Sequence, residues 1–65
     1  MTIKEIRESL GITQTHVVKT MRNKGFTIQR TTYSEKERGI RHFSAKEIQY
    51  LCILFDVDIK DITLV

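Results

Sequence analysis

The sequence predicts a single all-helical domain over residues 1–65, because local signals divide the chain into short helical stretches. Gly11, Gly25 and Gly39 are evenly spaced, and each follows a stretch of helical character, as expected of residues that end helices in a left-handed conformation. The chain has no proline, no internal repeat and no linker. A domain this short has a compact core and little room for an enclosed active site.

Capping residues mark where the helices are expected to begin. Thr2 with Glu5, and Ser44 with Glu47, have the Ser/Thr-x-x-Glu spacing of a capping box, which satisfies amide donors left bare in a first helical turn. Thr13 is a third expected cap. We therefore expect one helix to start after each of these hydroxyl residues.

Apolar residues recur at helical spacing in three of these stretches. The positions expected to be buried are Ile3, Ile6 and Leu10 in a first helix, Val17, Val18 and Met21 in a second, and Ile48, Leu51, Cys52 and Phe55 in a later one. A last short turn from Asp58 would bury Ile59 or Ile62.

Charge is distributed unevenly along the chain. Residues 16–42 carry seven cations and two anions, whereas residues 47–65 carry one cation and four anions. Within the basic middle, stretch 27–37 is polar on nearly every side and offers only Ile28 and Tyr33 to a core. A polar helix held by its neighbours usually faces something besides solvent, and beside basic residues nucleic acid is the expected partner. On charge alone, an ordinary solvated surface explains the asymmetry equally well.

The sequence lacks the motifs of enzymes and of metal sites. It has no glycine-rich phosphate loop and no nucleophile elbow, and His16 and His42 have no zinc-ligand spacing with cysteine or carboxylates. Cys52 lies in an apolar stripe, so we interpret it as a buried structural thiol. No apolar run approaches the roughly 20 residues that span a bilayer. We expect a soluble cytoplasmic protein that is not an enzyme, needs no cofactor and binds no membrane.

Four segments occur in a distinctive order and spacing. They are Gly11-Ile-Thr-Gln14, Thr32-Tyr-Ser-Glu-Lys-Glu-Arg-Gly39, Phe43-Ser-Ala-Lys-Glu-Ile48 and Phe55-Asp-Val-Asp58. Together they resemble the phage repressor and Cro-like helix-turn-helix family over about residues 3–62. The resemblance implies a lambda-repressor-like domain of five helices, of which the second and third form the helix-turn-helix. It also implies a phage or prophage transcriptional regulator that binds a double-stranded DNA operator in the bacterial host cell.

On this resemblance, the third helix, about residues 30–37, enters the major groove, and nine residues are predicted to contact DNA. They are Gln14, Lys24, Arg30, Thr31, Ser34, Glu35, Arg38, Arg41 and His42. Gln14 matches a glutamine that contacts a phosphate and braces the third helix. Arg30 and Thr31 match the first residues of the recognition helix, where arginine can fork onto the O6 and N7 of guanine. The loop residues from Arg38 onward match positions that touch the DNA backbone.

The chain departs from the family in three places. The connection over residues 21–29 is several residues longer than the family's tight turn. Gln29 stands where Ser or Thr normally caps the third helix, and Thr27 or Thr31 is an alternative cap that would shift the helix start. Lys36 replaces a residue that is more often aliphatic, so its stem is expected to pack while its ammonium reaches solvent.

Glu35 also favours a second function. A carboxylate facing the duplex is repelled by phosphate and is useful mainly for accepting from cytosine N4. A surface ion pair with Lys36 or Arg38 would explain Glu35 equally well. The alternative function is an anti-repressor, or modulator, that binds a partner repressor protein through the same face. The apolar tail 62–65 is expected either to contact the core or to join two copies in a homodimer.

Overall fold

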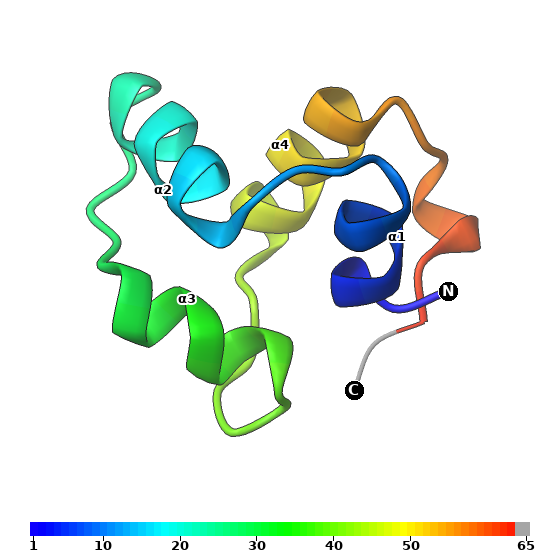
Figure 1. Cartoon of the computed structure of the whole chain (residues 1–65), viewed down its shortest axis with the longest axis horizontal. Coiled ribbons are helices and arrows are strands. Elements are labelled where there is room, and N and C mark those ends of the chain that lie inside the picture. The colour runs from blue at the N-terminus through cyan, green and yellow to red at the C-terminus, as the bar shows by residue number, and fades with distance from the viewer. Residues whose placement is uncertain (64–65) are drawn as a thin grey trace.

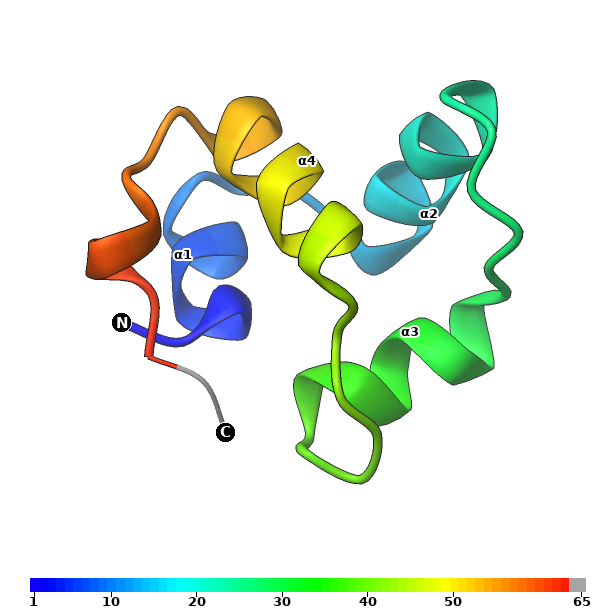
Figure 2. The ribbon, with the colours of Figure 1, turned by 180° about the vertical axis from the view of Figure 1, so that it is seen from behind.

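The computed structural model describes residues 1–63, and this part of the chain is all-helical, as predicted. Its elements are α1 (Ile3–Ser9), α2 (Gln14–Asn23), α3 (Arg30–Glu37), α4 (Ala45–Phe55) and the 3-10 turn η1 (Ile59–Asp61) (Figure 1). In place of the fifth predicted helix there is only the three-residue turn η1. Figures 1 and 2 show α4 between α1 and α2, with α3 beside α2.

The predicted capping residues begin three of the four α-helices. Thr2 and Ser44 each form a complete capping box, in which the hydroxyl accepts from the backbone three residues on and the Glu side chain accepts from the cap backbone. The hydroxyl of Thr13 accepts from the amide of His16 at 3.1 Å. Gln29 caps α3 without any side-chain hydrogen bond, so neither Thr27 nor Thr31 shifts the start of this helix.

The core lies between the four α-helices and contains most of the apolar residues that the spacing predicts. Its buried members are Ile3, Ile6, Val17, Val18, Met21, Ile28, Tyr33, Leu51 and Phe55. Ile48 is also buried, at 8% exposure. From the polar stretch, Ile28 and Tyr33 are buried as expected.

Two predictions about the core are wrong, those for Leu10 and Cys52, and the prediction that Ile59 or Ile62 is buried is met by Ile62. Leu10 is 50% exposed, because α1 ends at Ser9 and the chain leaves the helix at this residue. Cys52 is only half-buried, although burial raises the pKa of its thiol. In the final turn Ile62, not Ile59, packs against the core, and Ile59 is 60% exposed.

The connection between α2 and α3, residues 24–29, has an ordered course. Phe26 packs its ring on Tyr50 of α4 with centroids 5.5 Å apart, and Ile28 is buried. The guanidinium Nε of Arg22 donates to the carbonyl of Ile28 at 2.8 Å. Gly25 is in the left-handed region, with φ of 97°, just after α2 ends. The connection predicted to be long is therefore anchored at both of its apolar residues.

The two ends of the described chain lie side by side (Figure 1). The amino group of Met1 donates to the carbonyl of Asp61 at 3.0 Å, and the amide of Thr63 donates to the carbonyl of Met1 at 2.7 Å. Of the apolar tail, Ile62 contacts the core, whereas residues 64–65 lie outside the described part. Within residues 1–63, no helix is long and apolar enough to cross a membrane.

Phe55→Ala should reduce the free energy of unfolding by about 3–5 kcal/mol, because it removes a ring that is 3% exposed and leaves a cavity. Ile53→Ala is the matched control on α4, since Ile53 is 77% exposed and its loss should cost no more than about 0.5 kcal/mol. Urea denaturation followed by circular dichroism measures both. Equal effects of the two variants would mean that α4 packs through a different face.

Candidate nucleic-acid interface

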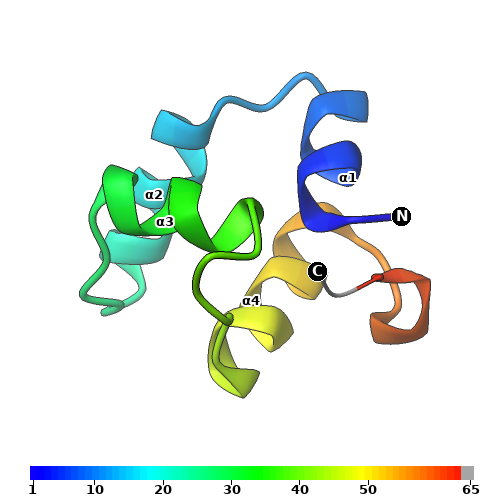
Figure 3. The same cartoon turned by 90° about the horizontal axis from the view of Figure 1, so that it is seen from below.

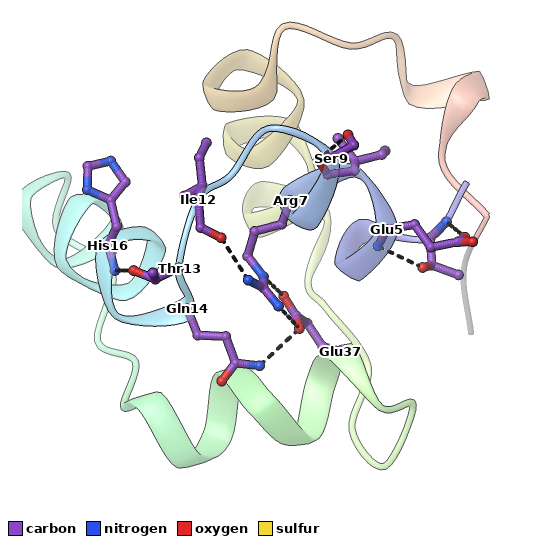
Figure 4. A network of polar contacts seen from close by, with 10 residues as sticks. Glu5, Arg7, Ser9, Ile12, Thr13, Gln14, His16 and Glu37 are labelled. Atoms are coloured by element: carbon purple, nitrogen blue, oxygen red, sulfur yellow. Dashed lines mark hydrogen bonds and ion pairs between the residues drawn. The ribbon is translucent and has the colours of Figure 1, made fainter.

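A buried ion pair joins the first and third helices (Figure 4). The guanidinium of Arg7 in α1 donates through Nε to Oε2 of Glu37 at 2.7 Å and through Nη2 to Oε1 at 3.2 Å. The two side chains are 9% and 1% exposed. Neither residue is predicted from the sequence to have a role, since no local pattern pairs side chains that are 30 positions apart.

The same carboxylate also receives a hydrogen bond from the second helix. Nε2 of Gln14, the first residue of α2, donates to Oε1 of Glu37 at 3.0 Å (Figure 4). Nη1 of Arg7 in turn donates to the carbonyl of Ile12 at 2.7 Å, in the segment between α1 and α2. Glu37 therefore connects α3 to both preceding helices, and Gln14 contacts the third helix as the family resemblance implies.

Burial and hydrogen bonding act on the pKa of Glu37 in opposite directions. Burial by itself would raise the pKa of this carboxyl, but the donors on Arg7 and Gln14 outweigh burial and lower it. The hydrogen bond to Glu37 likewise raises the pKa of Arg7. The hydroxyl of Tyr33 lies near this carboxylate without the geometry of a proper hydrogen bond, and burial raises its pKa. Both members of the ion pair are thus held in their charged forms.

A second ion pair joins α3 to α4. Nζ of Lys36 donates to both carboxylate oxygens of Glu47 at 2.7 Å, and Oε1 of Glu47 also accepts from the amide of Ser44 at 2.7 Å. The prediction that the ammonium of Lys36 reaches solvent is therefore wrong, because its side chain is 15% exposed and paired. Lys36 and Glu37 together tie the end of α3 to its neighbours on two sides.

The opposite face of α3 is open and carries a shallow hollow. Its lining residues all belong to the set predicted to contact DNA: Gln14, Arg30, Thr31, Ser34 and Arg38. Those from α3 and its C-cap recur at helical spacing, so they point to one side of the helix. The lining contains two guanidinium groups, two hydroxyls and one amide, and no carboxylate. Such a surface can donate several hydrogen bonds to an anion or to base edges.

The other four predicted residues lie elsewhere. Lys24 is exposed at the C-cap of α2 and lines neither this hollow nor its neighbours. Arg41 and His42, in the loop after α3, line a separate small cavity next to Lys36 and Glu37.

Glu35 forms an ion pair, but with a different partner from the two expected from the sequence. Its Oε1 accepts from Nε of Arg41 at 3.0 Å, so its partner is neither Lys36 nor Arg38. Arg41 is held to the end of α3 by this contact, with side-chain exposures of 61% for Arg41 and 28% for Glu35. The ion pair compensates the negative charge of Glu35 on this side of α3.

A second hollow, which the sequence analysis did not identify, adjoins the first. It lies between α2 and the start of α3 and is lined by Thr15, Val18, Lys19, Arg22, Asn23 and Arg30. Arg30 lines both hollows. The helical spacing of Thr15, Lys19 and Arg22 on α2 is the sequence signal that could have revealed it.

Ion pairing leaves the surface around these hollows strongly positive. Both carboxylates of residues 16–42, Glu35 and Glu37, are paired with arginines. Within the described chain, five cations of that segment have no carboxylate within 4.0 Å: Lys19, Arg22, Lys24, Arg30 and Arg38. Four of these five line the two hollows. The unpaired positive charges are therefore concentrated around the two hollows of α2 and α3.

Glu37→Gln should lower the free energy of unfolding by about 3–5 kcal/mol at pH 7, because it leaves the buried guanidinium of Arg7 without its counter-charge. Glu35→Gln breaks the exposed pair with Arg41 and should cost at most about 1 kcal/mol. Urea denaturation of both variants and of the unmodified chain provides the comparison.

The same experiment has a definite pH dependence. The folded-state pKa of Glu37 is lowered from its ordinary 4.5, so its stabilisation is complete above that value and is lost as the pH falls through the lower folded value. The difference in free energy of unfolding between the unmodified chain and Glu37→Gln should therefore be constant from pH 7 to 5 and become smaller below about 4.5. A difference that stays constant down to pH 2 would contradict the assigned ion pair.

Comparison with protein-family models, with curated proteins and with solved structures finds no significant match. The resemblance drawn from the sequence thus stays a prediction.

Proposed function

We propose that the chain is a sequence-specific, double-stranded-DNA-binding transcriptional regulator of phage or prophage type, with α3 as its recognition helix. The observation that carries this proposal is the composition of the hollow on α3. It gathers Gln14, Arg30, Thr31, Ser34 and Arg38, which are donors suited to phosphates and base edges, without any carboxylate.

The lining residues are suited to different parts of the DNA, according to their chemistry. Arg30, the first residue of α3, has a guanidinium that can form the forked contact to guanine O6 and N7. Thr31 and Ser34 have hydroxyls that both donate and accept, so they fit several base edges. Arg38, at the end of the helix, is placed to contact the DNA backbone.

Gln14 combines two roles in this proposal. Its amide nitrogen has two N–H groups, of which one donates to Glu37. The other is free to donate to a phosphate, while the first keeps α2 and α3 in a fixed relation. A helix that reads bases needs such support, since small displacements of its side chains weaken contacts to base edges.

The packing of α2 against α3 supports a helix-turn-helix arrangement, with residues 24–29 as an extended turn. Figure 3 shows α3 lying against α2, with α1 and η1 on the other side of the molecule. An eight-residue helix held only at its inner side can enter a major groove about 12 Å wide. The long turn separates the start of α3 from the end of α2. The turn itself is held in place, because Phe26 and Ile28 are packed.

The alternative, binding of a partner repressor through the same face, has less support. In the sequence, this alternative is suggested by the carboxylate of Glu35 on the helix expected to face DNA. Glu35 is paired with Arg41, which reduces the repulsion of phosphate by this side chain. We therefore favour DNA as the partner.

DNA affinity should fall steeply with salt, because cations that contact phosphates release bound counterions. With roughly three to five of the unpaired cations engaged, the slope of log affinity against log salt should be about −3 to −4.5. Fluorescence anisotropy with a labelled 20-base-pair duplex at several KCl concentrations measures it. A flat response between low and moderate salt would exclude DNA as the partner.

Arg30→Ala should weaken binding to the preferred sequence by about 1–3 kcal/mol and relax the preference at one base pair, because the forked guanine contact is lost. Selection from a random duplex pool first identifies that sequence, and repeating the selection with the variant gives the lost preference. Lys24→Ala is the comparison, since a phosphate contact carries no base information and its loss should weaken all sequences alike. Unchanged affinity and preference in Arg30→Ala would remove α3 from the proposed reading role.

A further inference from the structure

The second hollow concentrates positive charge in a small space. Lys19 and Arg22 of α2 and Arg30 of α3 all line it, together with the polar side chains of Thr15 and Asn23, and no carboxylate is part of the lining. Three like charges around one hollow repel one another unless an anion compensates them. Elsewhere in the described chain, Arg7, Lys36 and Arg41 have this compensation from carboxylates.

The donors of this hollow are arranged before any ligand binds. Thr15, Lys19 and Arg22 follow one another at spacings of four and three residues, so they share one face of α2. Val18, which is 5% exposed, contributes an apolar wall beside them. The side chains therefore converge on a common space by helix geometry alone.

Arg22 is further restrained by the long connection that follows α2. Its Nε donates to the carbonyl of Ile28, a residue that is 4% exposed and fixed in the core. This contact sets the plane of the guanidinium and leaves the Nη1 and Nη2 donors for another partner. A restrained guanidinium loses less conformational entropy when it binds an anion than a free one does.

We propose that this hollow binds one backbone phosphate of the DNA, next to the base pairs that α3 contacts. The proposal rests on the proposed function and extends it beyond α3. The assignment to a DNA phosphate follows from Arg30, which lines both hollows and so places the second one beside a duplex bound at the first. Lys19, Arg22 and Asn23 thereby extend the contact surface along α2.

Lys19→Ala tests the site. Lys19 is a solvent-exposed residue in the middle of α2, and it makes none of the hydrogen bonds or ion pairs described above. Loss of one phosphate contact should weaken binding about 5- to 10-fold at 0.1 M salt and flatten the salt slope by about one unit. The loss should be equal for the selected duplex and for a scrambled one. Lys60→Ala is the matched control and should change neither quantity, since Lys60 belongs to η1, and η1, the orange-red turn of Figure 1, lies on the other side of the molecule from α2.

A second measurement identifies the phosphate itself. Each backbone phosphate near the selected site is replaced in turn by a neutral methylphosphonate. At one position, neutralisation should weaken the unmodified protein by a larger factor than it weakens Lys19→Ala, because in the variant one of the contacts to that phosphate is already absent while Arg22 and Arg30 remain. If every neutralised position weakens both proteins equally, or if Lys19→Ala keeps the full salt slope, the second site is refuted.

These outcomes separate the two proposals. If the unmodified chain binds the selected duplex with a steep salt slope but Lys19→Ala behaves like Lys60→Ala, the proposed function stands and the phosphate site in the second hollow is refuted. If the chain shows no salt-dependent binding to any duplex, both the proposed function and the phosphate site are refuted. Circular dichroism of Lys19→Ala before each titration should match that of the unmodified chain, because alanine favours a helix.

Discussion

The position of α3 depends on one buried carboxylate. Glu37 is paired with Arg7 of α1 and accepts from Gln14 of α2, so three helices meet at a single charged group. Burying two charges is costly, and here several hydrogen bonds offset that cost. Apolar contacts alone would hold α3 weakly, because Tyr33 is its only buried hydrophobic residue. The polar network therefore specifies the orientation of α3 and of its exposed face.

Features decided within a few residues could be predicted from the sequence. Hydroxyl caps such as Thr2 and Ser44 act on amides three positions away, and an apolar residue such as Leu51 is recognised by its helical spacing. Features that need distant partners could not. The burial of Lys36 depends on Glu47, eleven positions on, and that of Arg7 depends on Glu37, 30 positions on.

The candidate site divides in the same way. The family resemblance selected Arg30 and Ser34, which lie on one face of one helix, and the structure places them in one hollow. The second hollow escaped prediction because Lys19 and Arg22 are joined there by Arg30, from beyond the connection 24–29. Only the folded course of that connection shows that these cations face the same space.

The two faces of α3 make different contacts, and under the proposed function this separation would let the residues that contact DNA change without altering how the helix packs. Inward-facing Tyr33, Lys36 and Glu37 hold it to the domain, whereas the outward side chains of Thr31 and Ser34 form none of the ion pairs and core contacts that hold it. Under the proposed function, new outward residues could therefore accumulate without loss of folding while the preferred DNA sequence changes. The scaffold would then be inherited while its specificity diverges.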